Sequence, residues 1–245
     1  MNTVPTLIEE SNLSIAWYSV LKQIVDNPGK DITPLLLSLN GFDEVNEVRR
    51  ILDLDLSVRH LNSVITVSET IFPDSLYKYC KNDRTELYKV YKNNLTRVKK
   101  IDPRNSSGTY FERLISFDDK NQLEIIINSL NTSGGVRRSK LQASIFDPKK
   151  DHINGPYQGF PCLQHVTFYK SDNNGLVLNS FYAIQYLYKK AYGNWLGLIN
   201  LGKFVAQEAG LQLHRVNCFV GAEHLDEEIT KTHARKLLTM IESKL

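Results

Sequence analysis

The 245-residue chain has few cysteines, a small net charge and no long apolar run. Its cysteines, Cys80, Cys162 and Cys218, form no Cys-x-x-Cys pair, and no cysteine–histidine pair has the spacing of zinc ligands. Neither a disulfide framework nor a metal site is therefore indicated. Because free cysteines are typical of a reducing compartment, we expect a cytoplasmic protein.

The net charge of +3 does not favour a nucleic-acid partner. No apolar run is long enough to span a bilayer, and Glu9 and Glu10 precede the first apolar run, unlike a signal peptide. Hydrophobic residues make up 42% of the chain and charged residues 23%, as in ordinary globular proteins. We therefore expect no membrane and no nucleic-acid partner.

Hydrophobic periodicity predicts a mixture of helices and strands. Helices are predicted over residues 12–26, with Asn12 or Ser14 as the N-cap, and over 74–79, 81–101, 121–131 and 192–210. Strands are predicted over 34–39, 141–146 and 216–220, and an antiparallel hairpin over 163–181 with its turn at 172–175. Because neither a repeat nor a linker interrupts the pattern, we predict a single α+β domain over residues 1–245.

Two element boundaries are predicted from turn and capping residues. Asn40-Gly41 is a turn dipeptide and is predicted to end the strand over 34–39. Asp226, Glu227 and Glu228 are predicted to open the last helix, since acidic residues favour the positive end of a helix dipole.

Cys162 directly follows a proline at the start of a strand-like run, residues 163–169. This run is rich in β-formers, and Pro161 can lie only at the start or the edge of such a strand. Cys162 is therefore either a small core residue or a nucleophile directed out of the strand end. Cysteine is among the most buried residue types, so the first alternative is the more common one.

The order of several short motifs favours the nucleophile. These motifs are Tyr110, the pair Arg137-Arg138, Pro161-Cys162, Asn194 at a helix start and His224 just past a strand. In this order and approximate spacing the chain resembles the thymidylate synthase family, which includes the pyrimidine nucleotide hydroxymethylases. The resemblance is firmest from about Gly108 to Asp226. It implies a thymidylate synthase-like α+β fold, in which a mixed sheet is packed with helices and one sheet face is used for dimerisation.

The resemblance also implies a reaction at C5 of a pyrimidine nucleotide or nucleoside. Cys162 would add to C6 of the ring, so that C5 becomes a carbanion able to attack a one-carbon donor. The implied donor is 5,10-methylenetetrahydrofolate, and the implied enzyme is a methyl- or hydroxymethyltransferase of nucleotide biosynthesis. Tyr110 would belong to the active-site network. From the residues alone, the alternative for Tyr110 is a tyrosine of the hydrophobic core.

The remaining motif residues would bind the substrate. Arg137 and Arg138 would reach across a homodimer interface to the nucleotide phosphate of the partner, a role that suits the guanidinium group. The Asn194 amide would read the pyrimidine edge, and His224 would contact the sugar hydroxyl. Judged alone, the arginine pair is more typical of a solvated turn. Asn194 is also compatible with a helix N-cap, and His224 with a strand-end histidine whose hydrogen bonds are satisfied.

Several positions depart from the family pattern. The family has a histidine at Leu163, an arginine and a serine for phosphate at Ala183 and Ile184, an aspartate tied to folate at Tyr186 and a tyrosine at Asp226. Glu69 is the best candidate for the general base of the family, although its surroundings match poorly. Losing charge-assisted hydrogen bonds of about 1.5–3 kcal/mol each would weaken phosphate binding at Ala183 and Ile184.

Two functions of different classes remain open from the sequence. The first is a divergent thymidylate synthase-like transferase that acts through a Cys162 adduct. The second is a catalytically inactive binding or structural protein with the same fold, for example a partner of an active paralogue. A third alternative is a reaction that needs the adduct but no folate, such as dehalogenation or exchange at C5.

Overall fold

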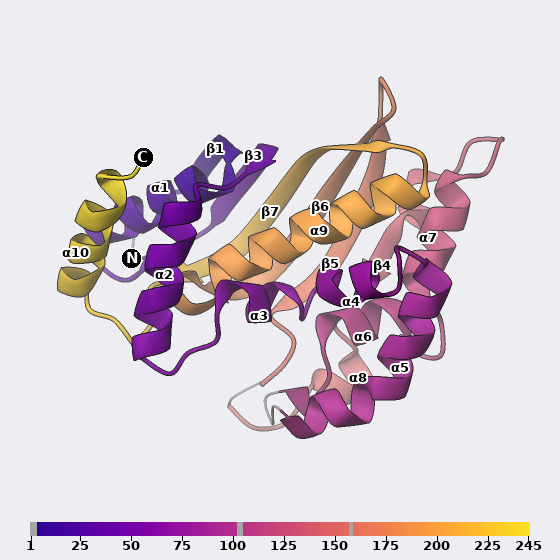
Figure 1. The fold of residues 1–245 in the computed structure, drawn as a ribbon, viewed down its shortest axis with the longest axis horizontal. Helices are drawn as coiled ribbons and strands as arrows, with labels where there is room; N and C mark the ends of the chain where they lie inside the picture. Colours follow the sequence, from indigo (N-terminus) through magenta and orange to yellow (C-terminus); the bar gives the residue numbers. More distant parts are fainter. Residues whose placement is uncertain (1–3, 102–104, 157–158) are drawn as a thin grey trace.

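The computed structural model describes residues 4–101, 105–156 and 159–245 (Figure 1). Its strands are β1 (Thr6–Asn12), β2 (Asp31–Ile32), β3 (Leu35–Asp43), β4 (Gln142–Ser144), β5 (Leu163–Ser171), β6 (Gly175–Tyr186) and β7 (Gln212–His224). Its helices are α1 (Leu13–Asp26), α2 (Asn46–Val58), α3 (Val64–Ser68), α4 (Asp74–Tyr79), α5 (Arg84–Ile101), α6 (Tyr110–Ile115), α7 (Gln122–Leu130), α8 (Pro148–Asp151), α9 (Tyr192–Glu208) and α10 (Lys231–Glu242). A 3₁₀ turn, η2 (Arg138–Lys140), precedes β4, and a π-helical turn, η3 (Leu187–Ala191), joins β6 to α9.

The strands described form one seven-stranded sheet in the order β1-β3-β7-β6-β5-β4, with β2 paired to β7. The β1–β3 and β6–β7 pairs are parallel, whereas β3–β7, β5–β6 and β4–β5 are antiparallel. The prediction of an α+β fold with a mixed sheet and packed helices is therefore confirmed.

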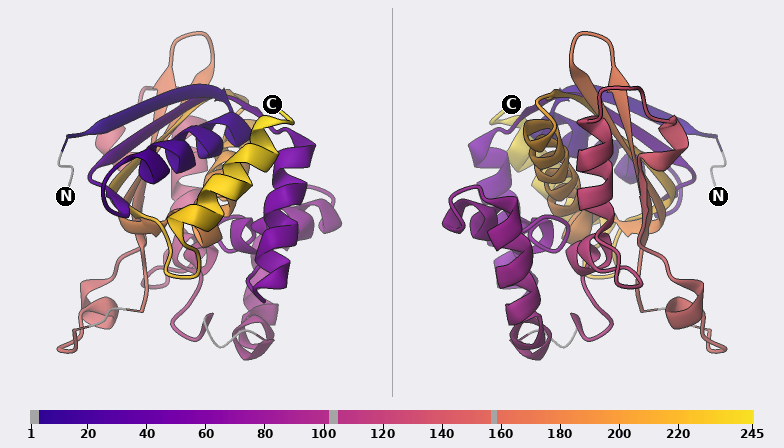
Figure 2. Two further views of the ribbon diagram at one scale, coloured as in Figure 1. Left: turned by 90° about the vertical axis from the view of Figure 1, so that its left-hand side faces the viewer. Right: turned by 90° about the vertical axis from the view of Figure 1, so that its right-hand side faces the viewer.

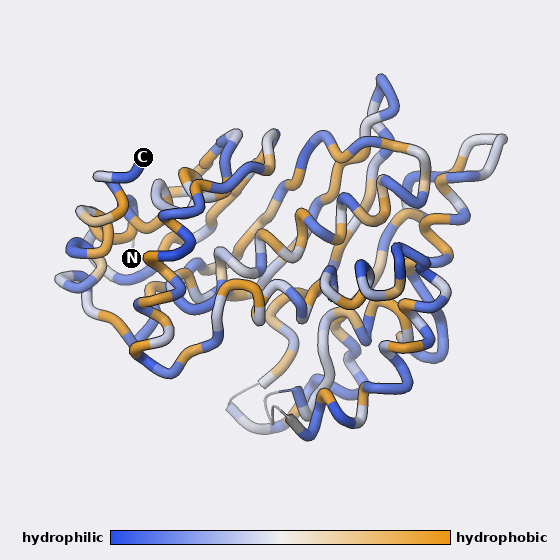
Figure 3. The backbone as a smooth tube through the Cα atoms, in the orientation of Figure 1, coloured by the Kyte–Doolittle hydropathy of each residue, from blue (hydrophilic) through white to orange (hydrophobic). Residues whose placement is uncertain are grey.

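Helices cover one face of this sheet. Figure 2 shows α1, α9 and α10 on the same side of the strands. The apolar segments of the central strands and of α9 run side by side in Figure 3, and the buried apolar residues form one contiguous cluster that includes Trp17, Leu37, Tyr182 and Trp195. The opposite face carries exposed apolar side chains, among them Phe181 and Phe219.

Several predicted elements are confirmed. Helix α1 begins as expected, because the side-chain oxygen of Asn12 accepts hydrogen bonds from the backbone N–H groups of Ser14 and Ile15. The antiparallel hairpin of β5 and β6 turns at Asn173 and Asn174, both at φ 57°. Asparagine tolerates this left-handed conformation better than most residues.

The predicted turn at Asn40-Gly41 is wrong, because both residues lie inside β3. The register of β1 and β3 shifts between Glu10 and Asn12, and the extra residues of β3 form an irregularity there. A Cβ atom on Gly41 would lie 2.2 Å from the Ser11 carbonyl oxygen. Glycine is therefore required here for the close approach of two strands and not for a turn.

The predicted acidic start of the last helix is also wrong. Helix α10 begins at Lys231, and its N-cap is Thr230, whose side chain accepts a hydrogen bond from the His233 N–H. The acidic residues precede the helix and have other partners: Glu227 binds Lys30, and Glu228 binds Lys189. Ion pairs with residues distant in the sequence, and not a helix dipole, therefore explain the positions of Glu227 and Glu228.

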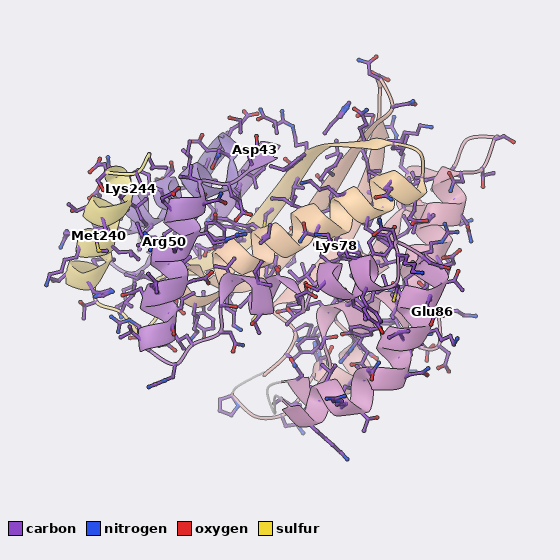
Figure 4. The ribbon with its side chains drawn as sticks, in the orientation of Figure 1. Asp43, Arg50, Lys78, Glu86, Met240 and Lys244 are labelled. Atoms are coloured by element: carbon purple, nitrogen blue, oxygen red, sulfur yellow. The ribbon has the colours of Figure 1, made fainter. Side chains whose placement is uncertain are left out.

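The outer surfaces of the helices are polar. Figure 4 shows Arg50, Lys78 and Glu86 on the outer sides of α2, α4 and α5. Within the described ranges, every helix is too short or too polar to cross a membrane.

Candidate functional site

Cys162 lies at the entrance to β5, immediately after Pro161, and its side chain is partly exposed. The Cys162 carbonyl oxygen accepts a hydrogen bond from the Ala183 N–H at 3.2 Å. This bond joins the start of β5 to the last part of β6. The thiol therefore lies close to the place where β6 leads into η3 and α9.

Tyr110 lies beside Cys162. It begins α6, whose start is fixed by a capping box between Thr109 and Glu112. The Tyr110 ring stacks on Phe160 with ring centroids 5.3 Å apart. Burial raises the pKa of Tyr110, the Cys162 thiolate raises it further, and hydrogen bonds from backbone groups of Leu163 and Cys162 oppose the rise. The phenol therefore stays protonated next to the thiol.

Two opposing influences act on the Cys162 thiol. Burial raises its pKa, because the thiolate loses hydration, and the Lys190 ammonium lowers it. Lys190 belongs to η3, downstream of Ala183, the position where the family has an arginine. A cation therefore acts on the thiol from a different part of the chain.

Replacing Lys190 by methionine is expected to raise the pKa of Cys162, because the cation that favours the thiolate is lost. The alkylation rate of Cys162 by iodoacetamide at pH 8 should fall by up to about tenfold, the effect of one pKa unit. Peptide-resolved mass spectrometry measures this rate. Lys170→Met, at an exposed site near the end of β5, is the matched control and should leave the rate unchanged. An unaltered rate in Lys190→Met would contradict this assignment.

Asp226 positions the turn that carries Lys190. Its carboxylate oxygen Oδ2 accepts hydrogen bonds from the backbone N–H groups of Tyr188 at 2.7 Å and Lys189 at 3.2 Å. The Lys189 ammonium lies 3.5 Å from the other oxygen of Asp226 and also binds Glu228. Asp226, which stands where the family has a tyrosine, therefore serves here as a fully buried cap of η3.

Asn194 lies in the first turn of α9, four residues after Lys190, and is only 5% exposed. Close packing against α3 holds this turn, since a Cβ atom on Gly193 would lie 2.6 Å from Val67. The side chain does not cap the helix, because η3 continues directly into α9. Among the described residues, the Asn194 amide has no hydrogen-bond partner, so it remains available to a ligand.

His224 is held by carboxylates. Its Nδ1 lies 2.6 Å from Asp31 and its Nε2 lies 3.2 Å from Glu227, so both ring nitrogens have partners. The Tyr186 ring packs edge-on against it at 6.0 Å. The burial pattern of β7 places the neighbouring Glu223, and not His224, on the helix-covered side. In this arrangement a sugar would have to displace a carboxylate to reach His224.

Arg137 and Arg138 are exposed near the edge strand β4. The Arg138 guanidinium lies over the ring of Tyr169 on β5, 4.8 Å from its centroid. Within the described chain, no contact joins either arginine to Cys162 or Asn194. The pair therefore lies apart from the thiol of its own chain.

Glu69, the candidate general base, has a local structural role. Its Oε1 accepts hydrogen bonds from the backbone N–H of Ser75 at 3.0 Å and from its hydroxyl at 2.8 Å, which fixes the start of α4. Burial raises the pKa of Glu69. No described contact links this carboxyl to Cys162.

The positions linked to folate do not offer polar groups for it. Leu163 is wholly buried. The ring of Tyr186 is covered by the Lys189 ammonium, 4.3 Å from the ring centroid. In the described part of the chain, no group of histidine, cysteine and acidic side chains could hold a metal ion.

Sequence reasoning did not identify three buried polar residues on β6 and β7, namely Tyr182, Gln185 and Glu223, of which Tyr182 interacts with Cys162. Burial raises the pKa of Tyr182 well above its ordinary value, and the neighbouring groups Tyr110, Cys218, Cys162 and Glu223 raise it further. The sequence signal for these residues was a set of polar side chains at positions of β6 and β7 that face the helices, where apolar side chains are expected. An irregularity in β6 concealed it, because Ala183 and Ile184 are both exposed and break the alternation.

Comparison with known proteins gives one informative similarity. No protein-family model matches the chain. The chain is 28% identical over 130 residues to a Methanopyrus kandleri protein named "Putative thymidylate synthase". The match covers 52% of this chain and 60% of that relative, so the chain spans about three fifths of the relative's length. The chain is therefore similar, over about half its length, to a protein named as a thymidylate synthase.

Proposed function

We propose that the chain is a divergent thymidylate synthase-like enzyme that activates C5 of a pyrimidine nucleotide or nucleoside through a covalent adduct of Cys162 at C6. The observation that carries the proposal is the partly exposed thiol at a strand entrance, which lies beside the Tyr110 phenol and is acted on by the Lys190 charge. The similarity to the Methanopyrus kandleri protein supports it independently.

The first step would be attack by the Cys162 thiolate on C6. Lys190 favours the thiolate, and the protonated Tyr110 phenol lies beside the sulfur. As the S–C6 bond forms, the π electrons of C5=C6 move to C5, with the charge shared by the C4 carbonyl. The buried Asn194 amide could bind the ring edge, as it can both donate and accept hydrogen bonds.

The residues at the positions linked to folate do not fit the one-carbon donor that the resemblance implies. The resemblance implies 5,10-methylenetetrahydrofolate, but Leu163 and Tyr186 do not fit the polar contacts that it implies. We therefore derive no step through folate. The chemistry assigned to this chain ends at the activated C5, which is also sufficient for exchange or dehalogenation.

A homodimer through the open sheet face is part of the proposal. This face carries the stacked pair Phe181 and Phe219, with centroids 5.5 Å apart, and Leu7, which is 68% exposed. A large exposed apolar patch on a sheet favours burial against another surface. Arg138 is held against Tyr169 of β5, at the border of the same face, from which it could reach a partner's nucleotide.

One set of observations favours an inactive binding protein as the second candidate. Burial raises the pKa of the Cys162 thiol, which disfavours the nucleophilic thiolate. Ala183 and Ile184 offer only apolar side chains where the family binds phosphate. Such a protein would bind a pyrimidine ligand without forming an adduct.

Intact mass spectrometry separates the two functions. We expect 5-fluoro-2′-deoxyuridine or its 5′-monophosphate to add one ligand mass to the wild-type chain, and Cys162→Ala to abolish this mass. Comparing nucleotide with nucleoside, and samples with and without methylenetetrahydrofolate, identifies the substrate form and the need for folate. Absence of an adduct together with a ligand-induced rise in the thermal midpoint would favour the binding protein.

A further inference from the structure

A cavity of about 330 Å³ opens beside Phe160, two residues before the nucleophile. Helix α6 contributes Arg113 to its lining, and α8, which lies beside α6 in Figure 1, contributes Lys150 and Asp151. Two residues of extended chain span at most about 7 Å. The wall of the cavity formed by Phe160 therefore lies close to Cys162.

The Arg113 guanidinium lines this cavity with hydrogen-bond donors to spare. The side chain is only 7% exposed, and a guanidinium group has five N–H donors. Nη1 donates to the Ile145 carbonyl and to Asp151, and Nη2 donates to the other oxygen of Asp151. Among the described residues, the Nε–H and the second Nη2–H have no partner. A ligand in the cavity could therefore accept two hydrogen bonds from a buried cation.

The charge around the cavity is positive. Asp151 offsets the Arg113 charge, and both Asp151 oxygens already accept hydrogen bonds from Arg113 or the Asp147 N–H. Lys150 adds a cation at the rim, where its ammonium contacts the Asp147 carboxylate at 3.3 Å. Because ion pairs of exposed side chains are weak, this ammonium can turn to a ligand. Two cations with free donors suit an oxyanion.

The aromatic wall disfavours a planar base in the cavity. The Tyr110 ring stacks on the Phe160 ring, and the Arg113 guanidinium lies over it, 5.3 Å from its centroid. The Phe160 ring therefore offers little open surface for a pyrimidine to stack on. The cavity is better suited to a phosphate group than to the ring of a nucleotide.

We propose that this cavity binds the 5′-phosphate of the pyrimidine nucleotide whose ring reacts with Cys162. The proposal rests on the proposed function and names a phosphate monoester as the substrate form. Arg113 donates two hydrogen bonds to the phosphate oxygens through Nε and Nη2, and Lys150 supplies the second cation. These contacts take the place of the charge-assisted hydrogen bonds that Ala183 and Ile184 cannot make.

The rates of adduct formation, followed by intact mass spectrometry, test this assignment. We expect 5-fluoro-2′-deoxyuridine 5′-monophosphate to modify the wild type at least about tenfold faster than 5-fluoro-2′-deoxyuridine at the same subsaturating concentration. Lys150→Ala should lower this ratio of rates by about tenfold, because one charge-assisted hydrogen bond is lost. An unchanged ratio in Lys150→Ala would overturn the proposal.

The matched control is Lys149→Ala. Lys149 is an exposed cation in the same helix but does not line the cavity. Its removal should leave the ratio unchanged, which separates a contact with the phosphate from a general effect of charge. An equal fall of the ratio in both variants would contradict a phosphate site in this cavity.

Titration calorimetry with inorganic phosphate tests the cavity without any pyrimidine. Lys150→Ala should weaken phosphate binding by about tenfold, and Lys149→Ala should not. Equal affinity in the wild type and Lys150→Ala would overturn the oxyanion site. If Lys150→Ala weakens phosphate binding but leaves the ratio of adduct rates unchanged, the cavity binds a separate anion and the assignment to the nucleotide is wrong. A wild type that forms no adduct with either ligand would instead refute the proposed function, while the phosphate titration still decides whether the cavity binds an oxyanion.

Discussion

Replacing Phe219 by aspartate is expected to convert a dimer of this chain into a monomer. Phe219 lies on the open face of the sheet, stacked on Phe181, and is 39% exposed in the single chain. Loss of about 1.5–3 kcal/mol of apolar burial in each copy, together with two unpaired charges, should raise the dissociation constant by at least about 10³-fold. Sedimentation velocity measures the change.

The matched control is Met240→Asp, the same change at a 55% exposed site on the outer side of α10 (Figure 4). It should leave the dimer intact. A monomeric wild type, or a dimer that survives Phe219→Asp, would contradict an interface on this sheet face. If the dimer separates while the alkylation rate of Cys162 is unchanged, the fold of the site does not depend on the partner.

Replacing Asp151 by alanine is expected to lower the free energy of unfolding by about 3–5 kcal/mol. Asp151 accepts two hydrogen bonds from the Arg113 guanidinium, at 2.7 and 3.2 Å, and both side chains are buried. Among the described residues, removing the carboxylate leaves the buried Arg113 guanidinium with the Ile145 carbonyl as its remaining hydrogen-bond acceptor. Denaturant unfolding followed by circular dichroism measures the loss.

The same substitution should also disturb the nucleophile. Arg113 packs over the Phe160 ring at 5.3 Å, and Phe160 in turn supports Tyr110 beside Cys162. Lys150→Ala is the control, because the Lys150–Asp147 pair is exposed on the lysine side and such pairs contribute only about 0–1 kcal/mol. Equal losses in the two variants would show that the buried pair does not stabilise this region.

Local patterns were sufficient to predict much of the fold. The Asn12 cap, the apolar spacing of α7 and the asparagine turn between β5 and β6 all act within a few residues, so the sequence reveals them. Asn40-Gly41 was misread because the reason for Gly41 is contact with Ser11 on another strand. Asp226 was misread for a similar reason, since its partners are amides of η3, a distant segment.

In the candidate site, too, local motifs could be predicted from the sequence, whereas contacts between distant segments could not. Cys162 and Tyr110 were identified from short motifs, and the structure places them together. Lys190 carried no motif, because its relation to the thiol arises from η3, a turn that lies far from Cys162 in the sequence. His224 and Glu69 were selected by resemblance, but local carboxylate and helix-capping contacts account for their positions. Tertiary packing therefore decided which polar residues surround the thiol.

The central claim is that Cys162 forms the covalent bond to the pyrimidine, and a peptide map tests it most directly. After incubation with 5-fluoro-2′-deoxyuridine or its 5′-monophosphate, we expect the added mass on the peptide that contains Cys162. Cys80 and Cys218 are buried, with their pKa values raised by burial, and should carry none. An adduct on either of these cysteines, or none on Cys162 with both ligands, would contradict the account.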